Sequence, residues 1–366
     1  MHPRALLLTV AFLTALAGCS QEQEATPEID RSAPAETAAA APESPNADLR
    51  ERAKSALGTL PVEALSESNP ITDDKVELGR VLYFDPRFSK NQDISCNTCH
   101  DLADFGVDGT PTSTGHKGQV GDRNAPTVYN AALHVAQFWD GRAADVEEQA
   151  KGPVLNPVEM AMPGEAAVIE VLKSVPGYEP LFAAAFPGEE NPITYDNMAR
   201  AIGAFERGLI TNDRLDEFLE GDDSALSANE RAGLAEFMDA GCITCHMGPT
   251  IGGTLYRKIG LVNPYETEDL GRFKVTQDEA DRYVFKVPSL RNVAGTEPYF
   301  HDGSIASLPE AIRLMGHHQL GIELTDAQVA SIAAFLGALN GTIDPDYIAP
   351  PALPESGSET PPPDPS

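Results

Sequence analysis

The chain has 366 residues and a formal net charge of −30, from 26 basic and 56 acidic side chains. Proteins bind nucleic acid largely through basic side chains that neutralise phosphates and release counterions. A chain this acidic lacks that contribution, which excludes nucleic acid as a main partner. Its 30 glycines and 30 prolines make up about 16% of the residues against a usual ~12%. This composition predicts long structured loops between short elements, and the length is sufficient for two domains with cores of their own.

An apolar segment near the amino terminus ends at Gly18. It is shorter than the ~20 residues that cross a bilayer as a helix, so residues 1–18 are predicted to be a secretion signal. The segment ends in Leu16-Ala17-Gly18-Cys19, which looks like the lipobox of bacterial lipoproteins, with Cys19 as the lipidated residue. An ordinary cleaved signal is the alternative. Either way the chain is exported, and we expect a periplasmic lipoprotein.

Low-complexity segments flank the expected folded body. Residues 19–50 contain few large apolar side chains, too few to offset chain entropy, and are predicted to be a disordered tether. Residues 346–366 are Pro-rich and are predicted to be a disordered tail. Between them we expect a first haem domain at 51–215 and a second at 216–345. This division rests on two cysteine motifs, one in each range.

Two copies of one motif contain four of the five cysteines: Cys96-Asn97-Thr98-Cys99-His100 and Cys242-Ile243-Thr244-Cys245-His246. In an exported chain, a Cys-x-x-Cys pair followed at once by His indicates covalent attachment of haem, with the His as an iron ligand. A Cys2His2 zinc site is the alternative, but its histidines are normally separated from the cysteine pair. The two copies therefore predict two c-type haems.

Helical patterns accompany both motifs. Thr72 precedes an apolar stripe ahead of the first motif, and Ser227 with Glu230 forms a capping box ahead of the second. Thr325 with Gln328 opens the expected closing helix of the second domain. The predicted fold is mostly α: two cytochrome c-like domains, each with one covalently attached haem, and long loops between the helices.

The ligand opposite the motif histidine on each haem iron distinguishes an electron carrier from an enzyme. For the second haem, Met315 lies far enough along the chain from His246 to reach the opposite face. Ligation by His and Met raises the potential of a haem and leaves no open site, which is typical of an electron store. His317 and His318 are alternatives that would lower the potential.

For the first haem, His116 lies in a glycine-flanked loop without apolar periodicity, which is a mobile place for a ligand. On spacing alone, a surface role for His116 is favoured, because a lone histidine in a loop is more often a surface residue than a ligand. His134 is a competitor, although its apolar neighbours favour a packed, structural histidine.

The order of these motifs resembles that of the bacterial dihaem cytochrome c peroxidase family. The resemblance covers roughly residues 66–340 and rests on both attachment motifs and on further blocks between and after them. These blocks are Gly115-His116, Asn124 to Thr127, Ala136 to Ala143, Gln149 to Pro153, Pro157 to Met160, Pro298 to Gly303, and Met315 ahead of Gln319-Leu320-Gly321.

The resemblance implies roles for particular residues. His116 matches the labile distal ligand of the peroxidatic haem, and Gln149 and Glu159 match polar residues of the peroxide pocket. Trp139 matches the aromatic residue between the haems, and Met315 matches the ligand of the electron-transferring haem. From the residues alone, Trp139 is equally compatible with a plain core position.

The resemblance also implies a calcium ion between the domains. Asn124, Thr296 and Pro298 match its ligands, the last two through main-chain carbonyls, and oxygen-only ligation suits a hard cation. From the residues alone, Asn124 is equally compatible with a turn-shaping role before Ala-Pro.

The expected function is reduction of hydrogen peroxide to water with electrons from a small periplasmic donor, such as a cytochrome c or a copper protein. Glu159 would move the proton and Gln149 would orient the peroxide. The family resemblance further implies a homodimer, and the lipobox-like segment at Cys19 predicts contact with the membrane through a lipid anchor only. One alternative is a dihaem oxidase that modifies a partner protein; such an oxidase would have Tyr in place of Met315. The other is a non-enzymatic dihaem electron carrier, which would need neither Glu159 nor Gln149.

Overall fold

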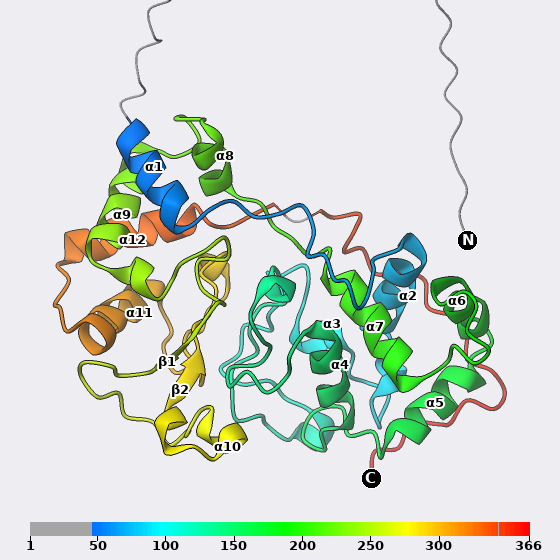
Figure 1. Cartoon of the computed structure of the whole chain (residues 1–366). Coiled ribbons are helices and arrows are strands. Elements are labelled where there is room, and N and C mark those ends of the chain that lie inside the picture. Colours follow the sequence, from blue (N-terminus) through cyan, green and yellow to red (C-terminus); the bar gives the residue numbers. More distant parts are fainter. Residues whose placement is uncertain (1–45, 343) are drawn as a thin grey trace, which may run out of the picture. The chain divides into compact units, whose positions relative to one another are not determined.

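Short helices joined by long loops make up most of the computed structural model, which describes residues 46–342 and 344–366 (Figure 1). The α-helices in these residues are α1 (Ala47–Ala56), α2 (Asp73–Phe84), α3 (Cys96–Cys99), α4 (Val146–Leu155), α5 (Glu165–Ser174), α6 (Tyr178–Ala185), α7 (Tyr195–Glu206), α8 (Arg214–Glu220), α9 (Ala228–Asp239), α10 (Phe273–Thr276), α11 (Leu308–Met315) and α12 (Asp326–Gly337). The mostly helical fold with long loops is therefore confirmed.

Shorter elements complete the chain. The strands β1 (Tyr256–Lys258) and β2 (Val284–Lys286) form an antiparallel pair with Tyr256 opposite Lys286. Single turns of 3₁₀ helix are η1 (Pro86–Phe88), η2 (His116–Gly118), η3 (Ala131–Leu133), η4 (Cys242–Thr244), η5 (Glu279–Asp281) and η6 (Val293–Gly295), and a π-helical turn, η7 (Gly316–Leu320), follows α11.

Three helices have side-chain caps at their amino termini, at the residues that the sequence predicted. Thr72 caps α2 by accepting a hydrogen bond from a backbone N–H of its first turn. Ser227 and Glu230 form the capping box of α9, and Thr325 and Gln328 form that of α12. Each cap satisfies N–H groups that a helix leaves without intrahelical partners, which fixes where the helix starts.

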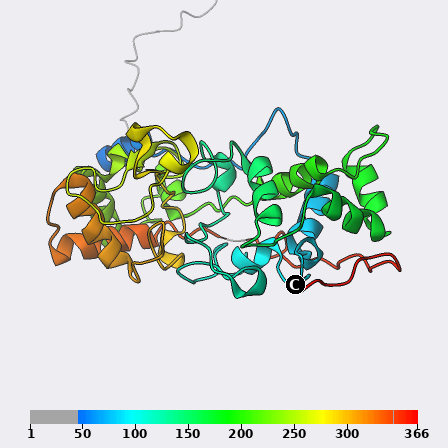
Figure 2. The same ribbon diagram turned by 90° about the horizontal axis from the view of Figure 1, so that it is seen from below.

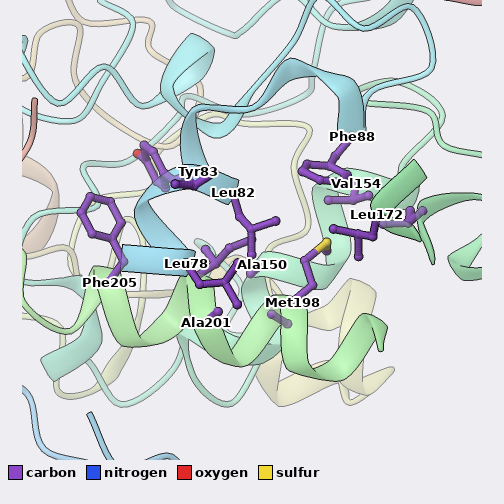
Figure 3. Close-up of a cluster of buried hydrophobic side chains, with 14 of the residues drawn as sticks. Leu78, Leu82, Tyr83, Phe88, Ala150, Val154, Leu172, Met198, Ala201 and Phe205 are labelled. Atoms are coloured by element: carbon purple, nitrogen blue, oxygen red, sulfur yellow. The ribbon is translucent and has the colours of Figure 1, made fainter. Parts of the chain in front are cut away.

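The first hydrophobic core, which we call the first core, lies around α2 and α7, and α4, α5 and α6 contribute to it (Figure 3). Figure 3 shows Leu78 and Leu82 of α2 above α7. The two helices cross at Gly79, where a Cβ atom would lie 1.9 Å from the carbonyl oxygen of Ala201. Glycine is therefore required at this crossing. Cys96 of the first attachment motif packs against the same core.

The second hydrophobic core, the second core, is built in the same way around α9 and α12. A Cβ atom on Gly233 of α9 would lie 1.9 Å from the carbonyl oxygen of Ser331 in α12. Cys242 of the second motif packs against this core. Each attachment motif thus follows a helix that crosses a later helix at a glycine.

The amino-terminal helix α1 belongs with the second core. Ala53 and Leu57 are buried there, and α1 lies beside α8 and α9 (Figure 1). The predicted tether at 19–50 therefore ends too late, and the first-domain range of 51–215 wrongly includes α1. Two apolar side chains one turn apart are enough to dock a short helix once a partner is present, and composition alone does not reveal that partner.

The carboxyl-terminal segment runs along the first core in place of the disordered tail predicted for 346–366 (Figure 2). The Tyr347 ring stacks on Phe205 with centroids 5.2 Å apart, and its hydroxyl donates to the Phe205 carbonyl at 2.7 Å. Further on, Gln92 Nε2 donates to the Pro361 carbonyl at 2.7 Å. Proline-rich chain is already extended, so ordering it costs less conformational entropy than ordering an ordinary tail.

Among residues 46–342 and 344–366, no helix is both long enough and apolar enough to cross a membrane. The predicted signal at 1–18, the predicted lipidation site at Cys19 and nearly all of the predicted tether lie outside the described residues.

Candidate active site

The first attachment motif forms the short helix α3. A capping box between Ser95 and Thr98 begins the helix and holds Cys96 and Cys99 on adjacent turns. The ring Nδ1 of His100 lies 3.4 Å from the carbonyl oxygen of Gly106. Burial lowers the pKa of His100, so the ring is neutral and its Nε2 lone pair is available to a metal.

The second motif has the same arrangement on η4. Gly241, with a φ of 95°, turns the chain from α9 into Cys242. The ring Nδ1 of His246 lies 3.3 Å from the carbonyl oxygen of Ile251, and burial lowers the pKa of His246 to about 4. A histidine whose Nδ1 is held by a carbonyl presents Nε2 as its ligand atom. Both motifs therefore carry a preset proximal ligand.

The four cysteines in the described chain form no disulfide with one another. Among the residues that the structure describes, no three or more His, Cys, Asp or Glu side chains form a group that could bind a metal ion. Zinc ligation by either motif would need such a group. The geometry therefore favours haem attachment over the zinc alternative.

A largely apolar cavity lies beside the second motif. Cys242, Cys245 and His246 line it, and so does Met315, the last residue of α11. An apolar cavity with two cysteines, a neutral histidine and a thioether fits a c-type haem with His and Met as iron ligands. Met315 and the second motif thus line the same cavity.

The alternative ligands His317 and His318 do not line this cavity. They lie on η7, whose other residues, Gly316, Gln319 and Leu320, do line the cavity. His317 is exposed and its Nδ1 lies 2.5 Å from a carboxylate oxygen of Glu323. His318 Nδ1 lies 3.0 Å from the carbonyl oxygen of Asn263.

His116 and Glu159 are joined through the backbone. The N–H of His116 donates to the Glu159 carbonyl at 2.8 Å, and the His116 side chain is buried. Gly115 makes this approach possible, because a Cβ atom there would lie 1.9 Å from the carbonyl oxygen of Val158. The ring Nε2 of His116 lies 3.3 Å from the carbonyl oxygen of Ser366, at the end of the carboxyl-terminal segment.

The Glu159 carboxyl group lies close to the first attachment motif. The pKa of Cys99 is raised chiefly by burial, and the charges of Asp108 and Glu159 add to the rise. Burial also raises the pKa of Glu159, against the opposing effect of Arg142. A raised pKa brings a carboxyl group closer to the range in which a general acid–base catalyst works.

Gln149 is half-buried on α4, and its side chain makes no hydrogen bond to another described residue. Trp139 belongs to neither hydrophobic core, which contradicts the plain core reading. Its Nε1 donates to the carbonyl of Asn124 at 2.9 Å, and its ring contacts His301 edge-on with centroids 6.4 Å apart. Trp139 and His301 both line the cavity of the second motif.

The predicted calcium residues Asn124, Thr296 and Pro298 line that cavity too. Asn124 uses its amide nitrogen, which donates to the Thr110 carbonyl at 3.0 Å. Its side-chain oxygen accepts no hydrogen bond within the described residues, and neither do the carbonyl oxygens of Thr296 and Pro298. The three residues thus line one cavity, and each has an oxygen atom without a hydrogen-bond partner in the part of the chain that the structure describes.

Sequence reasoning missed two buried features near the second motif. Lys286 is buried at the end of β2 and contacts His134, for which the sequence favoured a packed, structural role without indicating a charged partner. Arg291 is buried between Asp213 and Asp216 of the α8 turn. A lysine inside the apolar run Tyr-Val-Phe-Lys-Val-Pro was the one available signal for the first of these.

Two Cys-x-x-Cys-His motifs on a mostly helical fold define a c-type cytochrome with two haem attachment sites. A family model described as "Di-haem cytochrome c peroxidase" matches residues 73–224. The chain is 47% identical over 304 residues to the cytochrome c551 peroxidase of Nitrosomonas europaea, covering 82% of this chain and 90% of that protein. It is 44% identical over 320 residues to the cytochrome c551 peroxidase of Pseudomonas aeruginosa, covering 86% and 92%.

Among solved structures, a MauG-like protein associated with microbial copper homeostasis is similar, with a TM-score of 0.71 and 29% identity. That likeness covers 80% of this chain and 97% of the other. The chain belongs to the di-haem cytochrome c peroxidase family, as its motif order indicated.

Proposed function

We propose that this chain is a dihaem peroxidase that reduces hydrogen peroxide to water with electrons from a small periplasmic donor, such as a cytochrome c or a copper protein. One observation carries the proposal: the two attachment motifs have different surroundings. The half-buried carboxyl group of Glu159 acts electrostatically on Cys99 of the first motif, whereas Met315 lines the cavity of the second. A plain electron carrier needs no such carboxyl group. The peroxidase relatives support the same function.

The two motifs belong to two cytochrome c-like domains, each with one haem. The repeated helix crossing supports this division, because Gly79 of α2 contacts α7 in the way that Gly233 of α9 contacts α12. The first haem is held by Cys96, Cys99 and His100, with His116 as a displaceable ligand, and the second by Cys242, Cys245, His246 and Met315.

The bound haems supply the iron that holds peroxide and the two electrons that its reduction consumes. Glu159 carries a proton from the inner to the outer peroxide oxygen, so that water can leave. Gln149 has a free amide with which to orient the peroxide. Trp139 connects the two sites, a role supported by its position in the wall of the second cavity and its hydrogen bond to Asn124.

The direct test is an assay of the purified holoenzyme. Pre-reduced enzyme with calcium should oxidise a reduced small cytochrome c only when peroxide is added, and two electrons should be consumed for each peroxide. No peroxide-dependent turnover under these conditions would overturn the proposed function.

We expect His116→Gly to be active without prior reduction, because the displaceable ligand is absent. In the loop that carries His116, Lys117 and Gly118 both have positive φ angles, and Gly115 permits close contact with the neighbouring backbone. The oxidised variant should show one high-spin haem by spin resonance. Two low-spin haems and no activity in the oxidised variant would remove His116 as a ligand. His317→Gly, an exposed change off the cavity, is the control and should behave like wild type.

A calcium ion at Asn124, Thr296 and Pro298 controls that displacement. Three oxygens that line one cavity and have no partner among the described residues suit a hard cation. Chelation should leave reduction of the second haem intact and keep His116 on the first iron, because a ligand shifts an equilibrium only through its differential affinity for two states. Asn124→Ala should raise the calcium needed for activity.

Activity against free calcium is the measurement for this prediction, with wild type and His116→Gly both pre-reduced. His116→Gly should tolerate much lower calcium than wild type. Loss of both activities at the same calcium level would mean that the ion supports folding or chemistry directly.

The amino-terminal sequence supports export to the periplasm and a lipid anchor at Cys19. The family resemblance supports a homodimer. Labelling with a radioactive fatty acid, abolished by Cys19→Ser, tests the anchor.

A further inference from the structure

A lysine is buried in the wall of the second cavity. Lys286 ends β2 and is only 7% exposed, and its backbone N–H donates to the Trp139 carbonyl at 2.8 Å. Its Nζ has one partner within the described residues, Nδ1 of His134 at 3.1 Å. No carboxylate of this part of the chain lies within ion-pair distance of Nζ, and burial lowers the pKa of Lys286 to about 8. The ammonium group therefore has no counter-ion there.

The protonation of His134 follows from this contact. A lysine ammonium only donates, so Nδ1 of His134 accepts and the proton of the neutral ring sits on Nε2. Burial, with the charge of Lys286, lowers the pKa of His134 and keeps the ring neutral. Nε2 is buried and has no hydrogen-bond partner. The pair thus offers unused N–H donors and lacks an acceptor.

The surrounding backbone holds this pair in place. The Val135 N–H donates to the Gly253 carbonyl at 2.8 Å, and the Gly253 N–H donates to the Val287 carbonyl at 2.7 Å. A Cβ atom on Gly253 would lie 2.2 Å from Cδ2 of His134. The ring is therefore fixed against the chain that follows Lys286, and it cannot turn toward a different acceptor without moving this backbone.

The missing acceptor must carry negative charge. A buried ammonium without a counter-ion is strongly unfavourable, and a charge-assisted hydrogen bond to a carboxylate offsets that penalty. Lys286 and His134 line the same cavity as Cys242 and Cys245. The acceptor therefore belongs to the molecule that fills this cavity.

We propose that Lys286 and His134 bind a propionate carboxylate of the second haem. A haem carries two such carboxylates, and Lys286 is the buried cation of this cavity wall, whereas Arg257 on the same wall is exposed. The inference rests on the proposed second haem. The ammonium both neutralises the propionate and raises the potential of that haem, because a nearby positive charge favours the ferrous form. Lys286 thus holds the propionate of the second haem in place and favours storage of an electron on that haem.

Lys286→Gln tests the site, because it removes the charge and keeps a hydrogen-bonding group. In the holoenzyme, the ferric–ferrous equilibrium of the second haem should move toward ferric by about tenfold or more, which is 59 mV for one electron. Lys286→Arg should retain most of the wild-type potential. Lys258→Gln is the matched control: it removes the same charge from the same strand pair, but Lys258 is exposed and does not line the cavity.

A second readout reports the contact itself. Redox-difference infrared spectra should show a shifted propionate carboxylate band in Lys286→Gln and an unshifted band in Lys258→Gln. If Lys286→Gln does not fold, His134→Gln takes its place, with the same band shift and a smaller fall in potential. An unchanged band and an unchanged potential in whichever variant folds would overturn the proposal.

Failure of this inference is distinguishable from failure of the proposed function. A pyridine haemochrome assay counts the covalently attached haems. Two haems in wild type and in Lys286→Gln, with the same potential and band in both, would reject the propionate site and leave the peroxidase proposal standing. Fewer than two haems in wild type would contradict the proposed function first.

Discussion

Replacing Glu159 by Gln should slow cleavage of the peroxide O–O bond by about 100-fold to 10,000-fold, the usual cost of losing a general acid–base group. Gln is similar in size to Glu and leaves the His116 contact intact, because that hydrogen bond uses the Glu159 main-chain carbonyl. The raised pKa of Glu159 is what suits its carboxyl group to proton transfer, and an amide cannot replace it. Rapid mixing of the pre-reduced variant with peroxide measures the step.

Glu148→Gln is the matched control for this prediction. Glu148 lies on α4 beside Gln149, and its exposed carboxylate pairs with Lys151 at 2.7 Å. The same chemical change there should leave the rate unaltered. A Glu159→Gln rate within about threefold of wild type would remove Glu159 from the mechanism, since even the weakest general acid–base help exceeds that factor.

Replacing Arg291 by Met should lower the free energy of unfolding by about 3–5 kcal/mol, the usual cost of removing one partner of a buried ion pair. The Arg291 guanidinium bonds Asp213 at 2.6 Å and Asp216 at 2.7 Å, and all three side chains are buried. Burial raises the pKa of Asp213 to about 6 against the attraction of Arg291. Without the guanidinium, two neighbouring carboxyl groups would remain buried and unpaired.

Arg313→Met supplies the comparison for this prediction. Arg313 bonds Asp326 at 2.7 Å, but both side chains are largely exposed, and such surface pairs contribute about 0–1 kcal/mol. Denaturant unfolding of the two holoenzyme variants measures the difference. Equal losses of stability in the two variants would show that the buried cluster does not hold α8 to the loop after β2.

The sequence predicted features that depend on residues close together in the chain. The capping boxes at Ser227 and Thr325 agree with the structure, and the two attachment motifs agree with the family to which the chain belongs. A cap or a Cys-x-x-Cys-His motif is a local pattern whose chemistry does not depend on the rest of the fold. Local patterns of this kind can be recognised in a single sequence.

Features that join distant segments could not be predicted in this way. Lys286 meets His134, and Arg291 meets Asp213, across long stretches of chain. The docking of α1 on the second core and of the carboxyl-terminal segment on the first depends on surfaces that exist only after folding. The polar composition near α1 and the proline-rich composition of the carboxyl-terminal segment predicted disorder, but tertiary contacts order both segments.

The most direct test of the account is a redox titration of the calcium-loaded holoenzyme, followed by optical and spin-resonance spectroscopy. We expect two one-electron steps, the first at high potential with the spectrum of a His- and Met-ligated haem. In the half-reduced protein, the other iron should lose His116, become high-spin and react with peroxide. Two haems that titrate together, or a half-reduced protein in which both irons keep two protein ligands, would contradict the account.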